Sequence, residues 1–278
     1  MRTQFKPLLS VLVLVGLCSG AQAANFERVD YVGFAGYSAT TNGTPVSDAA
    51  LDLSPTAGDV TLFGANAFDT SLTNGSLAHS YAADAYLTFS AASTDLAMSL
   101  SQSMGATASG ALSVASHQQD ALIDLTAVKL KIVGQAGEAN GSAVNVSFAG
   151  NASALYDFNS MVNGGYLGVG LSVSRGDDVV GEYLWDVLQT GDQSVRFSFA
   201  GIVGEELSFS SYMLTGASLA NANFAQSSSP YTLAEAGASL EGSFTIAAVP
   251  EPESYAMLMA GLGLVGIIAR RRRSGTSK

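Results

Sequence analysis

Residues 167–187 have the sequence LGVGLSVSRGDDVVGEYLWDV, whose pattern is the clearest indication of secondary structure in the chain. In residues 167–173 every second residue is a large apolar one, which is the period-two pattern of a strand with one buried face. Residues 175–178 follow as a turn, because glycine and aspartate accept the backbone conformations that tight turns require. A second apolar stretch covers residues 180–187. The segment therefore predicts two strands joined by a turn.

The same alternation continues through most of the chain, with serine, threonine, asparagine and aspartate on the opposite face. It is found in residues 81–89, 96–100, 122–133, 144–148, 195–199 and 240–246. Turn-forming residues separate these stretches at 41–43, 73–75, 139–141, 163–165 and 190–192. These strands would be exposed to solvent on one face, and the sequence shows no long stretch with the 3.6-residue period of a helix. The pattern therefore predicts an all-β body with an antiparallel β-sandwich or jelly-roll-like fold.

Two segments need separate interpretation. Residues 91–117 are rich in alanine and serine, and a loosely helical insertion is an alternative there; the spacing of Leu96, Met98 and Leu100 by two favours strands. In residues 122–133 the alternation is carried by even-numbered positions, from Leu122 and Asp124 to Ile132. We see neither a linker nor an internal repeat.

The C-terminal segment 249–278 has a different organisation. Pro250-Glu251-Pro252 precedes an uncharged apolar run over 255–269. The prolines favour an extended, accessible connector. As a helix the run would be about 22 Å long, short of the ~30 Å hydrocarbon core, so spanning would recruit flanking residues.

A basic stop cluster follows the apolar run directly. It consists of Arg270, Arg271, Arg272 and Arg273. Arginines next to a membrane-inserted helix stay on the cytoplasmic side, which would place the body of the protein outside.

This tail resembles the PEP-CTERM sorting signal of Gram-negative bacteria, with Pro250, Glu251 and Pro252 at the motif that gives the family its name. The resemblance implies recognition by an exosortase, a membrane-embedded enzyme that removes the apolar helix after transient membrane anchoring. It also implies delivery to the cell surface or to an exopolysaccharide matrix such as that of a biofilm. An ordinary tail anchor is the alternative, and the resemblance concerns delivery rather than the role of the body.

The N-terminus predicts a signal peptide over residues 1–23. Arg2 and Lys6 precede an apolar stretch, and Ala21-Gln22-Ala23 forms a small-x-small site for signal peptidase before Ala24. A lipoprotein signal ending at Cys18 is the alternative, but Leu17 occupies the position where a small residue is expected. We therefore divide the chain into a signal peptide (1–23), a secreted all-β domain (24–248) and a sorting signal (249–278).

Composition excludes several classes of function for the exported part. Cys18 is the only cysteine, so residues 24–278 can form neither disulfides nor thiolate sites. Between residues 24 and 253 there are 5 basic and 23 acidic residues, a net charge of −18. Nucleic acid and anionic lipid headgroups are therefore excluded as partners, because nothing could neutralise their phosphates. Bridging by divalent cations remains open.

Candidate catalytic residues are few. His79 and His117 are the only histidines, and no nucleophile-elbow, zinc-protease or phosphate-loop motif is present. Glu182, Asp186 and Glu205 suggest a carbohydrate-active hydrolase as the alternative reading. Residues 182 and 186 would lie about 13 Å apart along one strand, too far for a retaining pair of carboxyls. We therefore expect the protein not to be an enzyme.

Binding residues can also be suggested. Asp177, Asp178 and Asp192 lie in turns and are candidates for Ca²⁺, although no ordered calcium-loop motif surrounds them; otherwise we expect no cofactor. The aromatic side chains that could stack on sugars are Tyr183, Trp185, Tyr212 and Tyr231, with burial favoured for Trp185 because its neighbours are apolar.

Together these features predict an exported surface or extracellular-matrix protein with a structural or adhesive role, associated with exopolysaccharide. A carbohydrate-active hydrolase or a carbohydrate-binding module on the same scaffold is the alternative.

Overall fold

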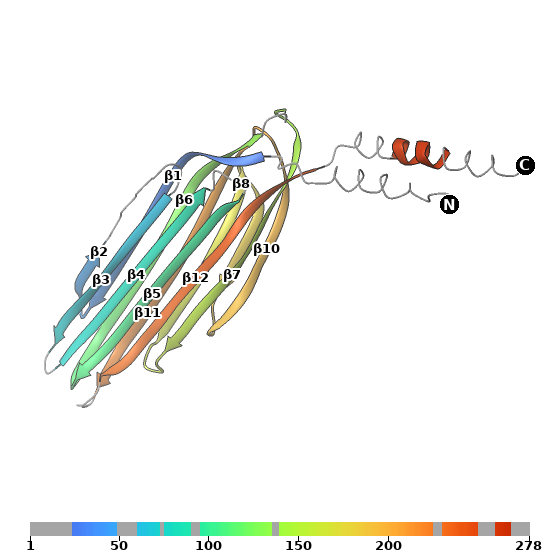
Figure 1. Ribbon diagram of the computed structural model, residues 1–278. Coiled ribbons are helices and arrows are strands. Elements are labelled where there is room, and N and C mark those ends of the chain that lie inside the picture. The colour runs from blue at the N-terminus through green and yellow to red at the C-terminus, as the bar shows by residue number, and fades with distance from the viewer. Residues whose placement is uncertain are drawn as a thin grey trace, which may run out of the picture. The chain divides into compact units, whose positions relative to one another are not determined.

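The computed structural model describes residues 24–48, 60–72, 75–89, 95–134, 139–224, 230–249 and 259–267. Twelve strands lie within these ranges and form the body shown in Figure 1. In chain order they are β1 (Ala24–Thr41), β2 (Thr44–Asp48), β3 (Val60–Leu72), β4 (Gly75–Phe89), β5 (Leu96–Gly110), β6 (Leu112–Gly134), β7 (Ala143–Phe158), β8 (Gly164–Arg175), β9 (Asp178–Asp186), β10 (Gly191–Ile202), β11 (Glu206–Phe224) and β12 (Tyr231–Ala248).

The strands form two six-stranded sheets that pack face to face. Sheet I has the order β2-β1-β6-β11-β8-β9, and sheet II has the order β10-β7-β12-β5-β4-β3. Neighbouring strands pair antiparallel in both sheets. The predicted antiparallel β-sandwich is therefore confirmed. β8 and β9 form the hairpin predicted from residues 167–187, with Arg175 paired to Asp178.

Alternation places the apolar residues of each strand between the sheets. Leu167, Val169, Leu171 and Val173 on β8 are all buried, while the residues between them face outward or lie under neighbours on the outer face. Of residues 91–117, the part from Leu96 onward consists of strands, as favoured, because β5 and the start of β6 occupy it; residues 91–94 lie outside the described residues. Gly43 and Gly176 adopt positive φ in the β1–β2 and β8–β9 turns, a conformation that glycine tolerates without strain.

The prediction for residues 122–133 was wrong in one respect. Leu122 and Asp124 do not share a face with Val128, Leu130 and Ile132, because the inward positions change from odd to even numbers within β6. The pairing registers of β1 and β11 with β6 shift at the same level, which marks a β-bulge. A bulge inserts one residue and reverses the alternation. Leu122 and Asp124 therefore lie on the outer face of sheet I.

The interior contains two regions of different chemistry. The aromatic core region consists of Phe26, Phe148, Phe197, Phe209 and Phe244, whose rings lie in mutual contact with centroid distances of 4.6 to 6.4 Å. The contact between Phe26 of β1 and Phe244 of β12 shows that β1 begins where β12 ends.

The polar core region lies toward the other end of β1. It consists of Tyr37, Thr41, His79, Tyr81, Gln102, His117, Gln119 and Thr215, all buried.

The chain divides into two compact units, residues 1–247 and 248–278. In the second unit the structure describes one helix over residues 259–267, about 13 Å long at 1.5 Å per residue. Among the described residues no helix has the length and apolarity needed to cross a membrane. The predicted transmembrane segment 255–269 is thus unsupported.

Both predicted terminal signals lie largely outside the described residues. Ala24, the predicted first residue of the mature chain, begins β1, whereas the signal peptide 1–23 with Ala21 and Ala23 is not among them. The other predicted positions outside the described residues are the sorting motif and the basic stop cluster, namely Pro250, Glu251, Pro252, Arg270, Arg271, Arg272 and Arg273. The roles assigned to these residues therefore stay predictions.

Candidate functional site

Three exposed aromatic rings lie on the outer face of sheet I, and we call them the aromatic platform. Phe34 is 42% exposed, Tyr166 42% and Tyr212 36%. Each ring covers a glycine: a β-carbon added at Gly36 would overlap the Phe34 ring. The same holds for Gly216 beneath Tyr166 and for Gly170 beneath Tyr212. Each ring thus lies directly against the backbone of a glycine, with no side chain beneath it.

Strand register explains this arrangement. Tyr212 of β11 lies opposite Gly170 of β8, and Tyr166 of β8 lies opposite Gly216 of β11. The Tyr212 ring therefore lies over β8, and the Tyr166 ring lies over β11. The two tyrosines are four residues, or about 13 Å, apart along the strands. The outward positions 166, 168 and 170 of β8 hold one tyrosine and two glycines. Only glycine leaves room for a ring directly against the backbone.

Carboxylates accompany the tyrosines. The Tyr166 hydroxyl donates a hydrogen bond to Asp120, whose other oxygen accepts one from Gln118 at 3.0 Å. Burial, reinforced by the hydrogen bond to Asp120, raises the pKa of Tyr166 above its ordinary value. The phenol therefore stays protonated and continues to donate.

Asp124 occupies the position between the other two rings. It is the cross-strand neighbour of Phe34 on β1 and of Tyr212 on β11. Partial burial raises the pKa of the Asp124 carboxyl. On the other side of Tyr212, a β-carbon added at Gly168 would lie 4.0 Å from both Asp186 Oδ1 and the Tyr212 ring. Tyr212 is thus flanked by the carboxylates of Asp124 and Asp186.

The aromatic residues suggested by the sequence have different positions. Tyr212 belongs to the platform, whereas Trp185 and Tyr183 are half-buried and pack against the core, as favoured for Trp185. Tyr231 is also half-buried and contacts Phe224 at a centroid distance of 5.9 Å. Sequence reasoning missed Phe34 and Tyr166. The available signal was the outward glycine two or four residues from each ring, as in Phe34-Ala35-Gly36.

The acidic residues considered for hydrolysis are not brought together. Glu182 and Asp186 both face outward on β9, since Glu182 pairs with Ser172 and Asp186 with Gly168. Their spacing along the strand is about 13 Å, as expected. Glu205 is engaged elsewhere, in an ion pair with Arg175.

The calcium candidates are separated as well. Asp177 lies in the turn before β9 and Asp178 begins that strand, whereas Asp192 follows the turn at its far end. The nine residues of β9 put about 30 Å between these positions, so the three carboxylates cannot share an ion. In the part of the chain that the structure describes, no group of three or more acidic, histidine or cysteine side chains is placed to hold a metal.

The two histidines lie inside the sandwich, 38 residues apart in sequence but with ring centroids 5.7 Å apart. His79 Nδ1 is hydrogen-bonded to the Tyr37 hydroxyl at 2.9 Å, and His117 Nδ1 to the Thr41 hydroxyl at 2.8 Å. His79 is 3% exposed and His117 is 2% exposed. Burial lowers the pKa of His117 to about 4. Both side chains belong to the packed interior rather than to a surface site.

Comparison with known proteins identifies the tail. Residues 248–273 match the model of the PEP-CTERM protein-sorting motif. The resemblance is thus confirmed, and it is confined to the C-terminal tail. The motif marks the chain as an exported protein that an exosortase processes after transient membrane anchoring. No curated protein matches the chain. Among solved structures, that of infectious bursal disease virus Gt strain aligns with 10% identity over 92% of this chain and 91% of that chain, at a TM-score of 0.14.

Proposed function

We propose that this protein is a polysaccharide-binding component of the cell surface or extracellular matrix, with a structural or adhesive role. Signal peptidase would release residues 1–23, and an exosortase would remove the tail. The body would then hold exopolysaccharide through the aromatic platform of sheet I. No cofactor is needed for this role, and Ca²⁺ is not required.

The observation that carries the proposal is the arrangement of three exposed rings on glycine. Sugars present apolar C–H faces that pack on flat aromatic rings, while their hydroxyls donate hydrogen bonds to nearby carboxylates. Tyr212 with Asp124 and Asp186, and Tyr166 with Asp120, each offer this combination. Two such places about 13 Å apart suit an extended chain better than a single small molecule.

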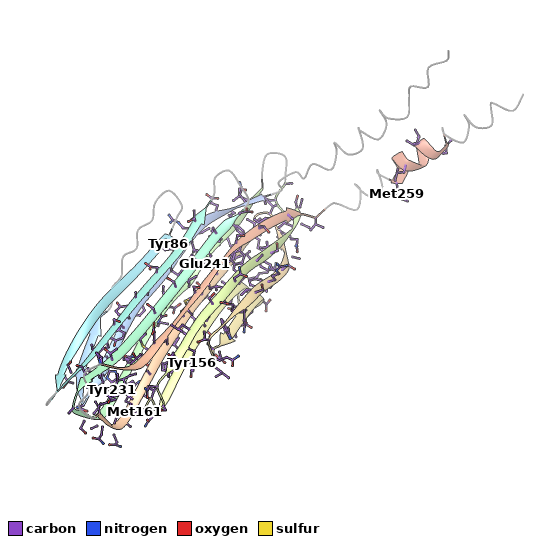
Figure 2. All side chains as sticks on the ribbon, turned by 60° about the horizontal axis from the view of Figure 1, so that its bottom comes forward. Tyr86, Tyr156, Met161, Tyr231, Glu241 and Met259 are labelled. Atoms are coloured by element: carbon purple, nitrogen blue, oxygen red, sulfur yellow. The ribbon has the colours of Figure 1, made fainter. Side chains whose placement is uncertain are left out.

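The test compares retention on the insoluble matrix polymer of the producing cells. We expect the mature protein to sediment with the polymer and the double variant Tyr166→Ala/Tyr212→Ala to remain in solution. Tyr86→Ala is the matched control, because Tyr86 is 44% exposed on the outer face of sheet II (Figure 2). Equal retention of wild type and the double variant would reject the platform as the binding site.

We further propose that the body does not hydrolyse what it binds. Glycosidases need two carboxyls roughly 5 to 9.5 Å apart, and Glu182 and Asp186 exceed this spacing. Release of reducing ends from the polymer should therefore stay at the rate without protein. Measurable release that is lost in Glu182→Gln would replace the binding role by a hydrolase. Retention should also persist in a chelator; release by chelation would instead indicate cation bridging through turn carboxylates such as Asp177, Asp178 and Asp192.

A further inference from the structure

The charges on the outer face of sheet I are all of one sign around the platform. Asp120, Asp124, Glu182 and Asp186 occupy outward positions there. The outward positions 34–40 of β1, 118–124 of β6, 212–220 of β11, 166–172 of β8 and 182–186 of β9 include neither lysine nor arginine. The platform is therefore anionic as well as aromatic.

The nearest basic residues have acidic neighbours of their own. Lys131 lies between Glu27 on β1 and Glu206 on β11 by strand register, and Lys129 lies opposite Asp30. Arg175 forms its ion pair with Glu205. None of these side chains is therefore available to compensate the carboxylates of the platform.

We propose that the platform selects polysaccharides whose sugars carry free, protonated amino groups. This inference rests on the proposed polysaccharide-binding function and names the class of polymer. An ammonium group donates three hydrogen bonds and accepts none, which complements carboxylates that can only accept. A cation is also attracted to the face of an aromatic ring. In Tyr212 one face is closed by Gly170, so only the outward face, flanked by Asp124 and Asp186, can receive it.

Asp124 gives the second argument. It is partly buried between Phe34 and Tyr212, so its ionised form loses solvation without gaining a cationic partner on the platform. A bound ammonium would supply that partner, whereas a neutral sugar would not. An anionic sugar would add repulsion to a body whose residues 24–253 already carry a net charge of −18.

Spacing argues for a polymer rather than a metal ion. Asp124 on β6 and Asp186 on β9 are three strand spacings apart, about 14 Å, and Asp120 lies about 13 Å from Asp124 along β6. Ca²⁺ needs six to eight oxygens within about 2.6 Å, which carboxylates so far apart cannot supply. A chain with an amine on successive sugars matches dispersed carboxylates.

The experiment measures binding of three oligosaccharides of equal length to the mature protein, at a pH where the amino sugar is protonated. The probes are a glucosamine oligomer, its fully N-acetylated counterpart and a uronic acid oligomer. We expect the glucosamine oligomer to bind about tenfold more tightly than the acetylated one, the sum of weak partly exposed ion pairs. Raising the salt concentration should weaken the binding of the glucosamine oligomer and leave that of the acetylated oligomer unchanged, because screening acts on exposed charges.

Conservative variants locate the effect. Asp124→Asn/Asp186→Asn should lower the affinity for the glucosamine oligomer to that of the acetylated oligomer and leave the latter within about twofold. Glu235→Gln/Glu241→Gln is the matched control, because both residues are exposed on β12 in sheet II; Figure 2 labels Glu241. Circular dichroism confirms that each variant is folded.

The outcomes separate the two proposals. Equal binding of the amine and acetylated oligomers, lost in Tyr212→Ala, would leave the polysaccharide-binding function intact and overturn the amine selectivity. Tightest binding of the uronic acid oligomer would also overturn the selectivity. Absence of binding by all three probes and by the matrix polymer would overturn both.

Discussion

The two core regions of the sandwich are both buried, but one is filled by apolar rings and the other by polar side chains. In the aromatic core region, Phe244 is completely buried and contacts four other phenylalanines. In the polar core region, buried side chains from both sheets hydrogen-bond to one another, through Tyr37, His79, His117 and Gln119. Burial of apolar rings stabilises in proportion to area, without a requirement for exact geometry. Buried polar groups contribute only while every partner is in place.

Hydrogen bonds join both histidines of the polar core region to neighbouring side chains. Gln119 Oε1 can only accept, and it receives the Tyr37 hydroxyl at 3.3 Å and His117 Nε2–H at 3.4 Å. The Tyr37 hydroxyl is also hydrogen-bonded to His79 Nδ1, at 2.9 Å. His117 Nδ1 then accepts from the Thr41 hydroxyl. Burial lowers the pKa of His117 to about 4, so its imidazole is neutral at pH 7, and a second proton on Nδ1 would face the Thr41 hydroxyl.

The largest effect should come from the aromatic core region. Phe244→Ala removes a completely buried ring at the centre of the cluster and should lower the free energy of unfolding by about 3–5 kcal/mol. Urea denaturation of the mature protein measures this loss. Tyr86→Ala on the exposed face should change stability by less than about 0.5 kcal/mol. A loss below about 1 kcal/mol for Phe244→Ala would show that this end of the core is not tightly packed.

Acid should destabilise the polar core region. The folded pKa of His117 is about 4, below its ordinary value of 6.5, so folding favours the neutral ring. The contribution of the neutral His117 ring to the free energy of unfolding is fully present above pH 6.5. It is lost as the pH falls toward 4, because the unfolded chain binds the proton at a higher pH than the folded protein does. A shift of this size corresponds to about 3 kcal/mol. His117→Gln should remove this part of the slope between pH 6.5 and 4, and an unchanged slope would contradict the assignment.

Tyr37→Phe tests the geometry of the hydrogen bonds. The ring and its stacking on Tyr81, at a centroid distance of 4.9 Å, should remain. His79 Nδ1 and Gln119 Oε1 would each lose a hydrogen-bond partner, which should cost about 1–3 kcal/mol. Thermal unfolding measures the loss, and an imidazole NMR spectrum should show the His79 signals shifted. A neutral substitution would mean that these hydrogen bonds are dispensable.

The smallest change should be a gain. The side-chain amide of Gln102 is buried and has no hydrogen-bond partner among the described residues. Replacing it by methionine, of similar length, removes two buried polar atoms and should stabilise the protein by about 1 kcal/mol. Gln189→Met, at an exposed position, serves as the control. Destabilisation by Gln102→Met would show that the amide is paired in the folded protein.

The sequence predicted the sandwich because alternation is a local property. The β8–β9 hairpin and the strand character of residues 96–117 follow from period-two spacing and turn residues alone. The face of Leu122 and Asp124 could not be predicted in this way. A bulge is a feature of paired strands, and residues 122–133 give no sign of where β6 gains one residue relative to β11.

The site was less predictable than the fold for the same reason. Tyr212 was recognised as a candidate, but its position over Gly170 depends on how β11 and β8 align. The pairing of His79 with His117 depends on how the two sheets face each other. Both are consequences of long-range register. A pattern of outward glycines beside aromatic residues is the part of this information that a sequence does contain.

The position of β12 has a mechanical consequence. This last strand of the body lies in the interior of sheet II, between β7 and β5, rather than at an edge. A pull on the chain beyond Ala248 would load the hydrogen bonds along both sides of an 18-residue strand in shear. Bonds loaded in shear share the force, and an interior strand has two rows of such bonds where an edge strand has one. The C-terminal end of the body, which exosortase processing would leave, should therefore resist mechanical unfolding.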